Sequence, residues 1–371
     1  MLRAEQQYFK NLDGLRFLCF LSVFTVHSLH TDDLQIQSTF LYKVTVEGLF
    51  AHGGLGVNFF FVLSGYLITY LLIFEKQTTG KINILHFWWK RIIRIWPLYF
   101  VCIIFGFFIF PYIKGAFGER VHETADLKLY LLFLSNFDII RNGWPDSTEL
   151  GVLWSIAIEE QFYLVWPILL YLVPVNRFWT LFLGIIVISL TFRTFHDNEI
   201  LYYYHTLSCI SDMAIGGLGA WLIHHSAVKE KIVSLSQTTI VLIYLAFAVC
   251  FVFKDQLFSH FLFTRVFERL TISILIILII LEQNYSINSF YKMGKYKRLS
   301  ELGITTYGMY MLHIIAIIVV VTTFKYLRIF KGGITIMIIG PLLGLMLSIW
   351  LSKLSYNHFE KKFLGLRRFL K

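Results

Sequence analysis

The stretch LDGLRFLCFLSVFTVH, residues 12–27, places Asp13 and Arg16 at the start of an apolar run and His27 near its end. A hydrocarbon core about 30 Å thick is crossed by a helix of roughly 20 apolar residues, so this run is long enough to span a membrane. Comparable apolar runs cover residues 15–30, 55–74, 92–113, 152–173, 178–195, 205–225, 237–254, 264–282, 303–327 and 334–354. The sequence therefore predicts an all-α polytopic membrane protein with about ten transmembrane helices around a central cavity.

The amino-acid composition excludes a soluble globular enzyme. Of the 371 residues, 57% are hydrophobic and only 15% are charged, whereas soluble domains are about one-quarter charged. The same apolar content excludes a disordered chain. The net charge of +10 requires no nucleic-acid partner, because the basic residues gather in particular loops, as membrane topology demands. The four cysteines lie inside apolar runs without metal-ligand spacing, and we expect no metal.

Three basic segments predict the topology, because cytoplasmic loops of membrane proteins are enriched in Lys and Arg. These segments are residues 76–94, 292–298 and 361–371. All three lie on one side of the membrane only if ten spans are counted, which leaves out residues 127–134 as too short to cross. We therefore expect both termini, with a basic tail at about 356–371, in the cytoplasm. Residues 114–151 then form a long external segment with a short or re-entrant helix, and the basic loop 325–331 is the one misfit.

No cleavable signal peptide is expected at the start of the chain. Residues 1–7 are polar, and the first apolar run, which begins after Leu15, lacks a small-residue cleavage site. A multi-pass chain of this kind suits a bacterial cytoplasmic membrane. No internal repeat or Pro-rich linker is visible, so we expect one integral-membrane domain over residues 1–371.

The first apolar run carries ionisable groups, which are costly inside a span and therefore indicate function. Arg16 and His27 are eleven residues apart, which is about three helical turns, so their side chains share nearly the same face over about 16 Å. Asp13 precedes Arg16 by three positions and can hold its guanidinium. The spacing predicts one stripe with a carboxylate, a fixed cation and a titratable imidazole. The alternative is a juxtamembrane ion pair with an unrelated core histidine.

The third apolar run begins with cations. Within residues 87–97, Lys90, Arg91 and Arg94 place three positive charges in five residues, and the two arginines share a helix face. This arrangement suits the phosphate groups of a ligand. It equally suits a positive-inside anchor with interfacial tryptophans, and the residues alone leave both interpretations open.

Two carboxylates and a second histidine lie inside later runs. Glu159 and Glu160 are adjacent, so their side chains point about 100° apart, and only Glu159 joins the stripe of Ser155 and Tyr163. Lipid-facing positions do not explain two such carboxylates. His313 lies in the middle of its run, where a hydrogen-bonded structural histidine is at least as frequent as a catalytic one.

Together these segments resemble the acyltransferase 3 family of integral-membrane, acyl-CoA-dependent enzymes, which mostly O-acetylate glycans. Five motifs in the family's order, spread from residue 9 to about residue 360, carry the resemblance. They are LDGLR with Arg16-(ten residues)-His27, the Phe-rich segment 57–66 that ends in Ser-Gly-Tyr, Arg91-x-x-Arg94-x-x-Pro97, LWSIAIEEQFYLVW at 153–166, and Tyr310-x-Leu-His313. Some members carry an additional soluble esterase-like domain. The resemblance then implies that a chain ending at Lys371 completes the transfer itself or passes the acyl group to a separate partner.

The resemblance implies a transmembrane acetyl relay from cytoplasmic acetyl-CoA to a hydroxyl of an extracytoplasmic or lipid-linked glycan. Because the donor is cytoplasmic, its phosphates are expected to meet Arg91 and Arg94, with Lys90 beside them and Arg16 on the first span. The expected partners are acyl-CoA, a carbohydrate or glycolipid acceptor and membrane lipid.

For catalysis, the resemblance implies that His27 acts as general base toward the acceptor hydroxyl or carries the acetyl group briefly. Asp13 would orient Arg16, and one of the two adjacent glutamates would orient His27 or the acceptor. The candidate catalytic residues are then Asp13, His27, Glu159, Glu160 and His313.

Two other functional classes compete with an enzyme. A proton-coupled membrane transporter also uses buried His, Glu and Arg side chains, but no duplicated half with Gly/Pro-broken helices is evident in the sequence. A non-catalytic scaffold does not explain the buried ionisable stripe.

Overall fold

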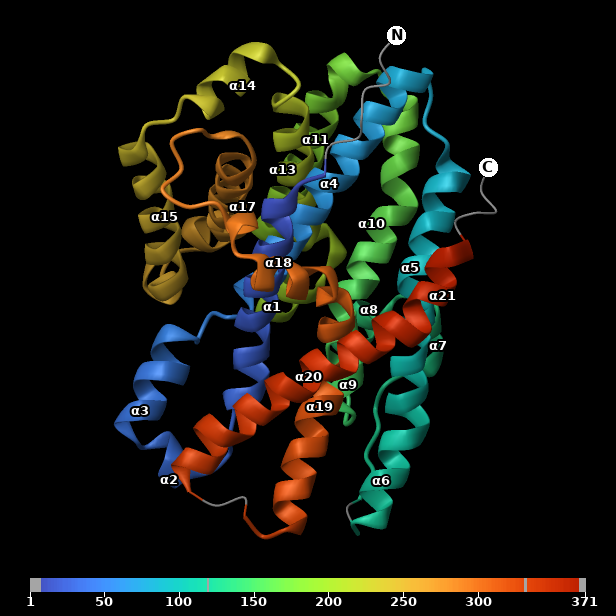
Figure 1. Ribbon diagram of the computed structural model, residues 1–371, viewed down its shortest axis with the longest axis vertical. Coiled ribbons are helices and arrows are strands. Elements are labelled where there is room, and N and C mark those ends of the chain that lie inside the picture. The colour runs from blue at the N-terminus through green and yellow to red at the C-terminus, as the bar shows by residue number, and fades with distance from the viewer. Residues whose placement is uncertain (1–7, 119, 330–331, 367–371) are drawn as a thin grey trace. The chain divides into compact units, whose positions relative to one another are not determined.

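A computed structural model describes residues 8–118, 120–329 and 332–366 (Figure 1). All regular secondary structure within these residues is helical. The chain forms two compact units. The first comprises Met1–Arg16, Val57–Trp88 and Ile158–Gly303. The second comprises Phe17–Gly56, Trp89–Ala157 and Ile304–Lys371. Residues 1–7 and the basic residues Arg367, Arg368 and Lys371 of the predicted tail lie outside the described residues.

The first unit is a group of packed helices. Those that lie wholly or mostly in it are α4 (Leu55–Thr79), α10 (Leu153–Leu172), α11 (Phe178–Phe195), α12 (Glu199–Tyr204), α13 (Thr206–Leu222), α14 (Ser226–Val233), α15 (Gln237–Val252), α16 (Lys254–Phe258), α17 (Leu262–Tyr285) and α18 (Lys297–Ile304). α11 packs against α13, and both contact α17, which also contacts α14, α15 and α16 (Figure 1). Polar residues cap the starts of two helices: Asn198 Oδ1 accepts from Ile200 N, and Ser236 Oγ accepts from Thr239 N.

The second unit contains the remaining helices. They are α1 (Lys10–Leu29), which starts in the first unit, α2 (Leu34–Gln37), α3 (Phe40–Tyr42), α5 (Ile84–Ile104), α6 (Phe110–Ala116), α7 (Leu127–Leu131), α8 (Ser135–Asn142), α9 (Thr148–Gly151), α19 (Thr306–Tyr326), α20 (Gly340–Ser355) and α21 (Lys361–Leu364). Single π-helical turns cover Lys43–Leu49, Phe105–Ile109, Thr335–Ile339 and Tyr356–Glu360. α19 packs along α20 and also contacts α9 (Figure 1).

Within the described residues, seven helical segments are long and apolar enough to cross a membrane, and the bent pair α13–α14 adds an eighth if it is counted as one span. Each of the ten apolar runs of the sequence coincides with a helix or with consecutive helical segments. The protein is therefore an all-α polytopic membrane protein, as predicted. In residues 127–134 the structure has only the five-residue α7, which is too short to cross. The count of ten crossings, the central cavity and the single domain stay predictions.

α4 and α13 approach each other closely at two glycines. A Cβ atom at Gly65 would lie 2.0 Å from the carbonyl oxygen of Met213, and one at Gly216 would lie 2.0 Å from the carbonyl oxygen of Val62. No larger side chain fits at either position without moving a backbone. The two glycines therefore let the backbones of α4 and α13 pack closely.

A lysine from α4 caps the C-terminal end of α10. Lys76 Nζ donates hydrogen bonds to the carbonyl oxygens of Leu170, Tyr171 and Val173 at 2.7, 2.9 and 2.7 Å. The last carbonyls of a helix lack partners within it, and a cation there also offsets the negative end of the helix dipole. This cap holds together the two helices that carry the carboxylate site described below.

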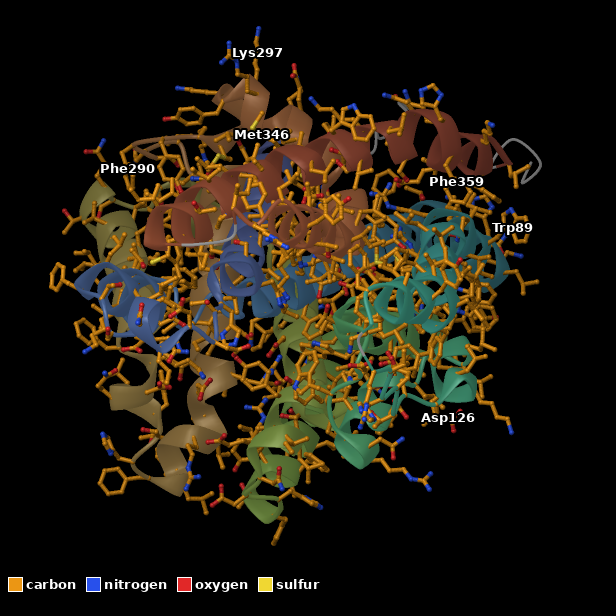
Figure 2. The ribbon with its side chains drawn as sticks, turned by 90° about the horizontal axis from the view of Figure 1, so that it is seen from below. Trp89, Asp126, Phe290, Lys297, Met346 and Phe359 are labelled. Carbon is orange, nitrogen blue, oxygen red and sulfur yellow. The ribbon has the colours of Figure 1, made fainter. Side chains whose placement is uncertain are left out.

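α20 carries a stripe of exposed apolar side chains. Leu342, Met346 and Trp350, spaced four residues apart, are 56%, 65% and 58% exposed. Figure 2 shows Met346 projecting outward from the helix. Lipid tails are as apolar as these side chains, so the stripe suits contact with membrane lipid.

Candidate active site

In the first unit, the start of α1 pairs a carboxylate with a cation. Arg16 Nη1 donates to Asp13 Oδ1 at 2.5 Å, and Tyr8 OH donates to Asp13 Oδ2. The carboxylate side chain is 6% exposed, whereas 30% of the Arg16 side chain is exposed. The predicted pairing of Asp13 with Arg16 is confirmed. The Asp13 carboxylate therefore orients the Arg16 guanidinium.

The first unit also holds Glu159 in a hydroxyl-rich site. Ser64 Oγ donates to Glu159 Oε1 at 2.8 Å, and Tyr163 OH donates to Glu159 Oε2 at 3.0 Å. Tyr163 OH also lies 3.3 Å from Ser64 Oγ. The predicted stripe of Glu159 and Tyr163 is present, and Ser64 takes part in it from α4. The neighbouring Glu160 is half-buried on a different face of α10.

In the second unit, α1 brings three rings onto His313 of α19. The ring centroids of Phe20, Phe24 and His27 lie 5.8, 6.3 and 5.3 Å from the His313 centroid. The three residues follow each other at four- and three-residue steps, so they share one face of α1. His313 is fully buried, and His27 is half-buried. The structure thus brings together the two histidines that the sequence singled out, and leaves only His27 accessible.

The predicted phosphate-binding cations lie on α5. Lys90 is exposed, while Arg91 and Arg94 are half-buried. Arg94 interacts electrostatically with the carboxylate of Glu360, which accepts a hydrogen bond from Ser355 Oγ at 3.0 Å. The buried Glu360 therefore offsets part of the positive charge of Arg94.

A buried ion pair in the first unit was not singled out from the sequence. Arg269 of α17 donates from Nη2 and Nε to Asp212 Oδ2 of α13 at 2.6 and 3.2 Å. The same carboxylate accepts from Asn58 Nδ2 at 3.2 Å and from Ser273 Oγ at 3.0 Å. Both charged groups lie inside predicted apolar runs, so the rule that flags ionisable groups in spans could have found them.

A second buried guanidinium lies in the same unit. Arg193 of α11 is 1% exposed and donates to the hydroxyls of Ser189 and Ser211 and to the carbonyl oxygens of Ser208 and Val266. All of these acceptors are neutral. Such bonds tie α11, α13 and α17 together, and they indicate a structural role for Arg193.

The segment between α6 and α10 is fixed by ionic and backbone hydrogen bonds. Lys114 Nζ lies 2.5 Å from Asp146 Oδ1, and the Glu123 carboxylate accepts from the backbone N–H groups of Asp146 and Ser147. Burial disfavours ionisation of Asp146, but donation from Lys114 and from the His122 backbone lowers the pKa of this carboxyl below its usual value. These bonds join Lys114, His122 and Glu123 to residues 146–147.

Among the residues that the structure describes, no group of three or more His, Cys, Asp and Glu side chains has the arrangement of a metal site. The candidate site residues described above carry imidazole, carboxylate, hydroxyl and guanidinium groups. These groups can move protons and bind anions.

A comparison with known families decides the classification. The family model described as an acyltransferase domain, that of acyltransferase 3, matches residues 9–353, which is nearly the whole chain. The chain belongs to the acyltransferase 3 family. The resemblance seen in the five sequence motifs is thereby confirmed.

Curated relatives of this acyltransferase 3 chain include O-acetyltransferase OatA of Staphylococcus aureus (strain NCTC 8325 / PS 47), which is 26% identical over 377 residues covering 95% of this chain. Peptidoglycan O-acetyltransferase OatA of Listeria monocytogenes is 27% identical over 330 residues, or 84% of this chain. The chain spans only 57% and 50% of the lengths of these two relatives. No solved structure matches it significantly.

Proposed function

We propose that this chain is a membrane O-acyltransferase that moves an acetyl group from cytoplasmic acetyl-CoA to a hydroxyl of an extracytoplasmic or lipid-linked glycan. Two relatives are named as O-acetyltransferases, one of them of peptidoglycan, which favours an acetyl group and a glycan acceptor. The observation that carries the proposal is the half-buried imidazole of His27 on α1, whose ring centroid lies 5.3 Å from that of the fully buried His313.

The proposed reaction needs a base, because a sugar hydroxyl is a poor nucleophile until its proton is removed. A ring nitrogen of His27 takes that proton while the hydroxyl oxygen forms a bond to the acetyl carbonyl carbon. The bond from this carbon to sulfur then breaks, and the coenzyme A thiolate receives the proton from His27 to leave as a thiol. A positioned base of this kind contributes about 10²–10⁴-fold in rate.

Charged groups of the first unit receive supporting roles in the proposal. Asp13 holds Arg16 by the ion pair at 2.5 Å and thereby orients its guanidinium. Glu159 accepts hydroxyl protons in hydrogen bonds from Ser64 and Tyr163, and a sugar hydroxyl offers the same donor. We therefore assign orientation of the acceptor hydroxyl to Glu159 or to its neighbour Glu160.

The donor phosphates are assigned to the α5 cations, and this assignment predicts a binding defect. Replacing Arg91 or Arg94 with Ala is expected to raise the KM for acetyl-CoA about 10-fold or more, since a hydrogen bond to a charged group is worth roughly 1.5–3 kcal/mol. The kcat at saturating donor should change less. Lys should rescue only in part, because it lacks the planar guanidinium fork.

Lys90 provides the matched control for these two arginines. It carries the same charge on the same helix but is exposed, so Lys90→Ala should raise the KM by a smaller factor. The measurement is initial-rate kinetics with acetyl-CoA varied. An unchanged KM in both Arg91→Ala and Arg94→Ala would show that these arginines only anchor the protein at the membrane surface.

The proposed location is the bacterial cytoplasmic membrane, with both termini in the cytoplasm and residues 114–151 outside. Single cysteines placed at Lys361 and at Arg120, in a variant lacking the four native cysteines, are expected to react with a membrane-impermeant thiol reagent from opposite sides. The physical reason is the bias of basic loops toward the cytoplasm. Labelling of both positions from the same side would contradict the ten-span topology.

The proposed function is tested in cells by mass spectrometry of envelope glycans with and without the gene. O-acetyl esters on one glycan should disappear in the deletion strain, and the wild-type gene should restore them. The His27→Gln gene, expressed at equal level, should not. An identical ester profile in all strains would contradict the proposed function and would leave the transporter class to be tested.

A further inference from the structure

His313 has one ring nitrogen engaged and the other without a partner. Its Nδ1 lies 2.6 Å from the carbonyl oxygen of Tyr310. A carbonyl oxygen only accepts hydrogen bonds, so Nδ1 carries the proton and Nε2 presents a lone pair. Within the described part of the chain, Nε2 has no hydrogen-bond partner. Because the His313 side chain is fully buried, bulk water does not satisfy this atom either, which is a costly state.

The imidazole of His27 lies close enough to reach this lone pair. The two ring centroids are 5.3 Å apart at an interplanar angle of 54°. Since each nitrogen lies about 1 Å from its ring centre, ring rotation alone can bring the two within the roughly 3 Å of a hydrogen bond. Phe20 and Phe24 also contact the His313 ring, but their side chains carry no polar atom. The Tyr310 hydroxyl is already bonded to a serine of α10 at 2.6 Å.

We propose that His313 is a positioning residue for His27, an inference that rests on the proposed role of His27 as the base. Nε2 of His313 accepts the N–H of His27 and so leaves the other ring nitrogen of His27 as a lone pair for the acceptor hydroxyl. When that nitrogen takes the hydroxyl proton, His27 becomes an imidazolium with two N–H groups. The hydrogen bond from the His27 imidazolium to Nε2 of His313 is then charge-assisted, and such a bond is stronger than one between two neutral groups.

The burial of the two rings separates their roles. His27 is half-buried and can meet a substrate, whereas His313 is fully buried and cannot. His313 therefore acts through His27. A third group that fixes the tautomer and orientation of a catalytic histidine is a recurrent arrangement in acyl-transfer enzymes.

Two substitutions separate the two contacts of the His313 ring. An Asn at this position can place its amide N–H near Nδ1 and keep the bond to the Tyr310 carbonyl, but it offers nothing at Nε2. A Gln reaches further and can place an acceptor oxygen near Nε2. We expect His313→Asn to lower kcat about 10- to 100-fold, a part of the factor that a general base contributes. We expect His313→Gln to recover much of that loss, with the KM for acetyl-CoA within about twofold in both.

A spectroscopic readout tests the contact without turnover. In protein with ¹⁵N-labelled histidine, the His27 signals, assigned with His27→Gln, should show one tautomer in the wild type and a mixture of tautomers in His313→Asn. Phe20→Leu, which alters packing against the same ring but no polar atom, should leave the His27 tautomer unchanged.

The outcomes are decisive in either direction. A wild-type kcat in folded His313→Asn, or a single His27 tautomer that persists in this variant, overturns the positioning role and leaves His313 a structural residue. If His313→Asn does not fold, the wild-type ¹⁵N spectrum decides, because a mixture of His27 tautomers there overturns the contact and a single tautomer supports it. Full turnover in His27→Gln refutes instead the role of His27 as the base, and the tautomer result still reports on the contact between the two rings.

Discussion

Replacing His27 with Gln is expected to lower the rate of acetyl transfer by about 10² to 10⁴-fold, which for most assays means no measurable product. The amide of Gln reproduces the hydrogen-bonding capacity of the imidazole but cannot accept a proton at neutral pH. Expression and membrane insertion should be unchanged, because His27 is half-buried and one polar group replaces another. The measurement is turnover by purified protein at saturating donor and acceptor.

His30→Gln is the matched control for this experiment. His30 lies just beyond the end of α1 with 69% of its side chain exposed, and it should tolerate the change. Near-normal turnover in correctly folded His27→Gln would exclude both a base and an acyl-carrier role for this residue. The chemistry would then have to lie with Glu159 or Glu160.

Breaking the buried pair of Asp212 and Arg269 is expected to give the largest loss of stability. The two side chains are 0% and 8% exposed, and they bond through two guanidinium nitrogens. Arg269→Leu leaves a buried carboxylate without its counter-ion, which typically costs about 3–5 kcal/mol. Replacing both partners with Leu should cost less than the single change. The measurement is thermal unfolding in detergent, monitored by fluorescence-detected size-exclusion chromatography. It ranks the midpoint temperatures of the wild type, the single variant and the double variant.

A second ion pair on α17 serves as the comparison. Glu268 lies 3.2 Å from Lys254, and these side chains are 21% and 13% exposed. Because water reaches this pair, Glu268→Gln should lower the midpoint much less than Arg269→Leu. An Arg269→Leu midpoint equal to that of the wild type would show that the pair contributes nothing to the fold.

Much of the helical architecture could be predicted because it depends on local sequence. Hydropathy located all ten apolar segments that the structure shows as helices. Spacing within a helix also predicted that Asp13 would pair with Arg16 and that Glu159 would share a stripe with Tyr163. Such predictions succeed because the helical repeat fixes which side chains are neighbours.

Contacts between helices were beyond this reasoning. Nothing in the spacing of residues indicates that His27 meets His313, that Ser64 donates to Glu159, or that Asp212 bonds to Arg269. These pairs depend on which helix faces pack together, and packing is decided by shape at sites such as Gly65. The roles of Asp13, His27, Glu159, Glu160 and the α5 cations in catalysis stay predictions.

The most direct test of the central claim is transfer of a labelled acetyl group by the purified protein in proteoliposomes. Radiolabelled acetyl-CoA is supplied on the side of the C-terminal tail, and a polymeric glycan such as peptidoglycan fragments is supplied on the other side. The account predicts an alkali-labile, covalent acetyl ester on the glycan with the wild-type protein and none with His27→Gln. Label that crosses the membrane without becoming covalently attached would contradict it and would favour a transporter.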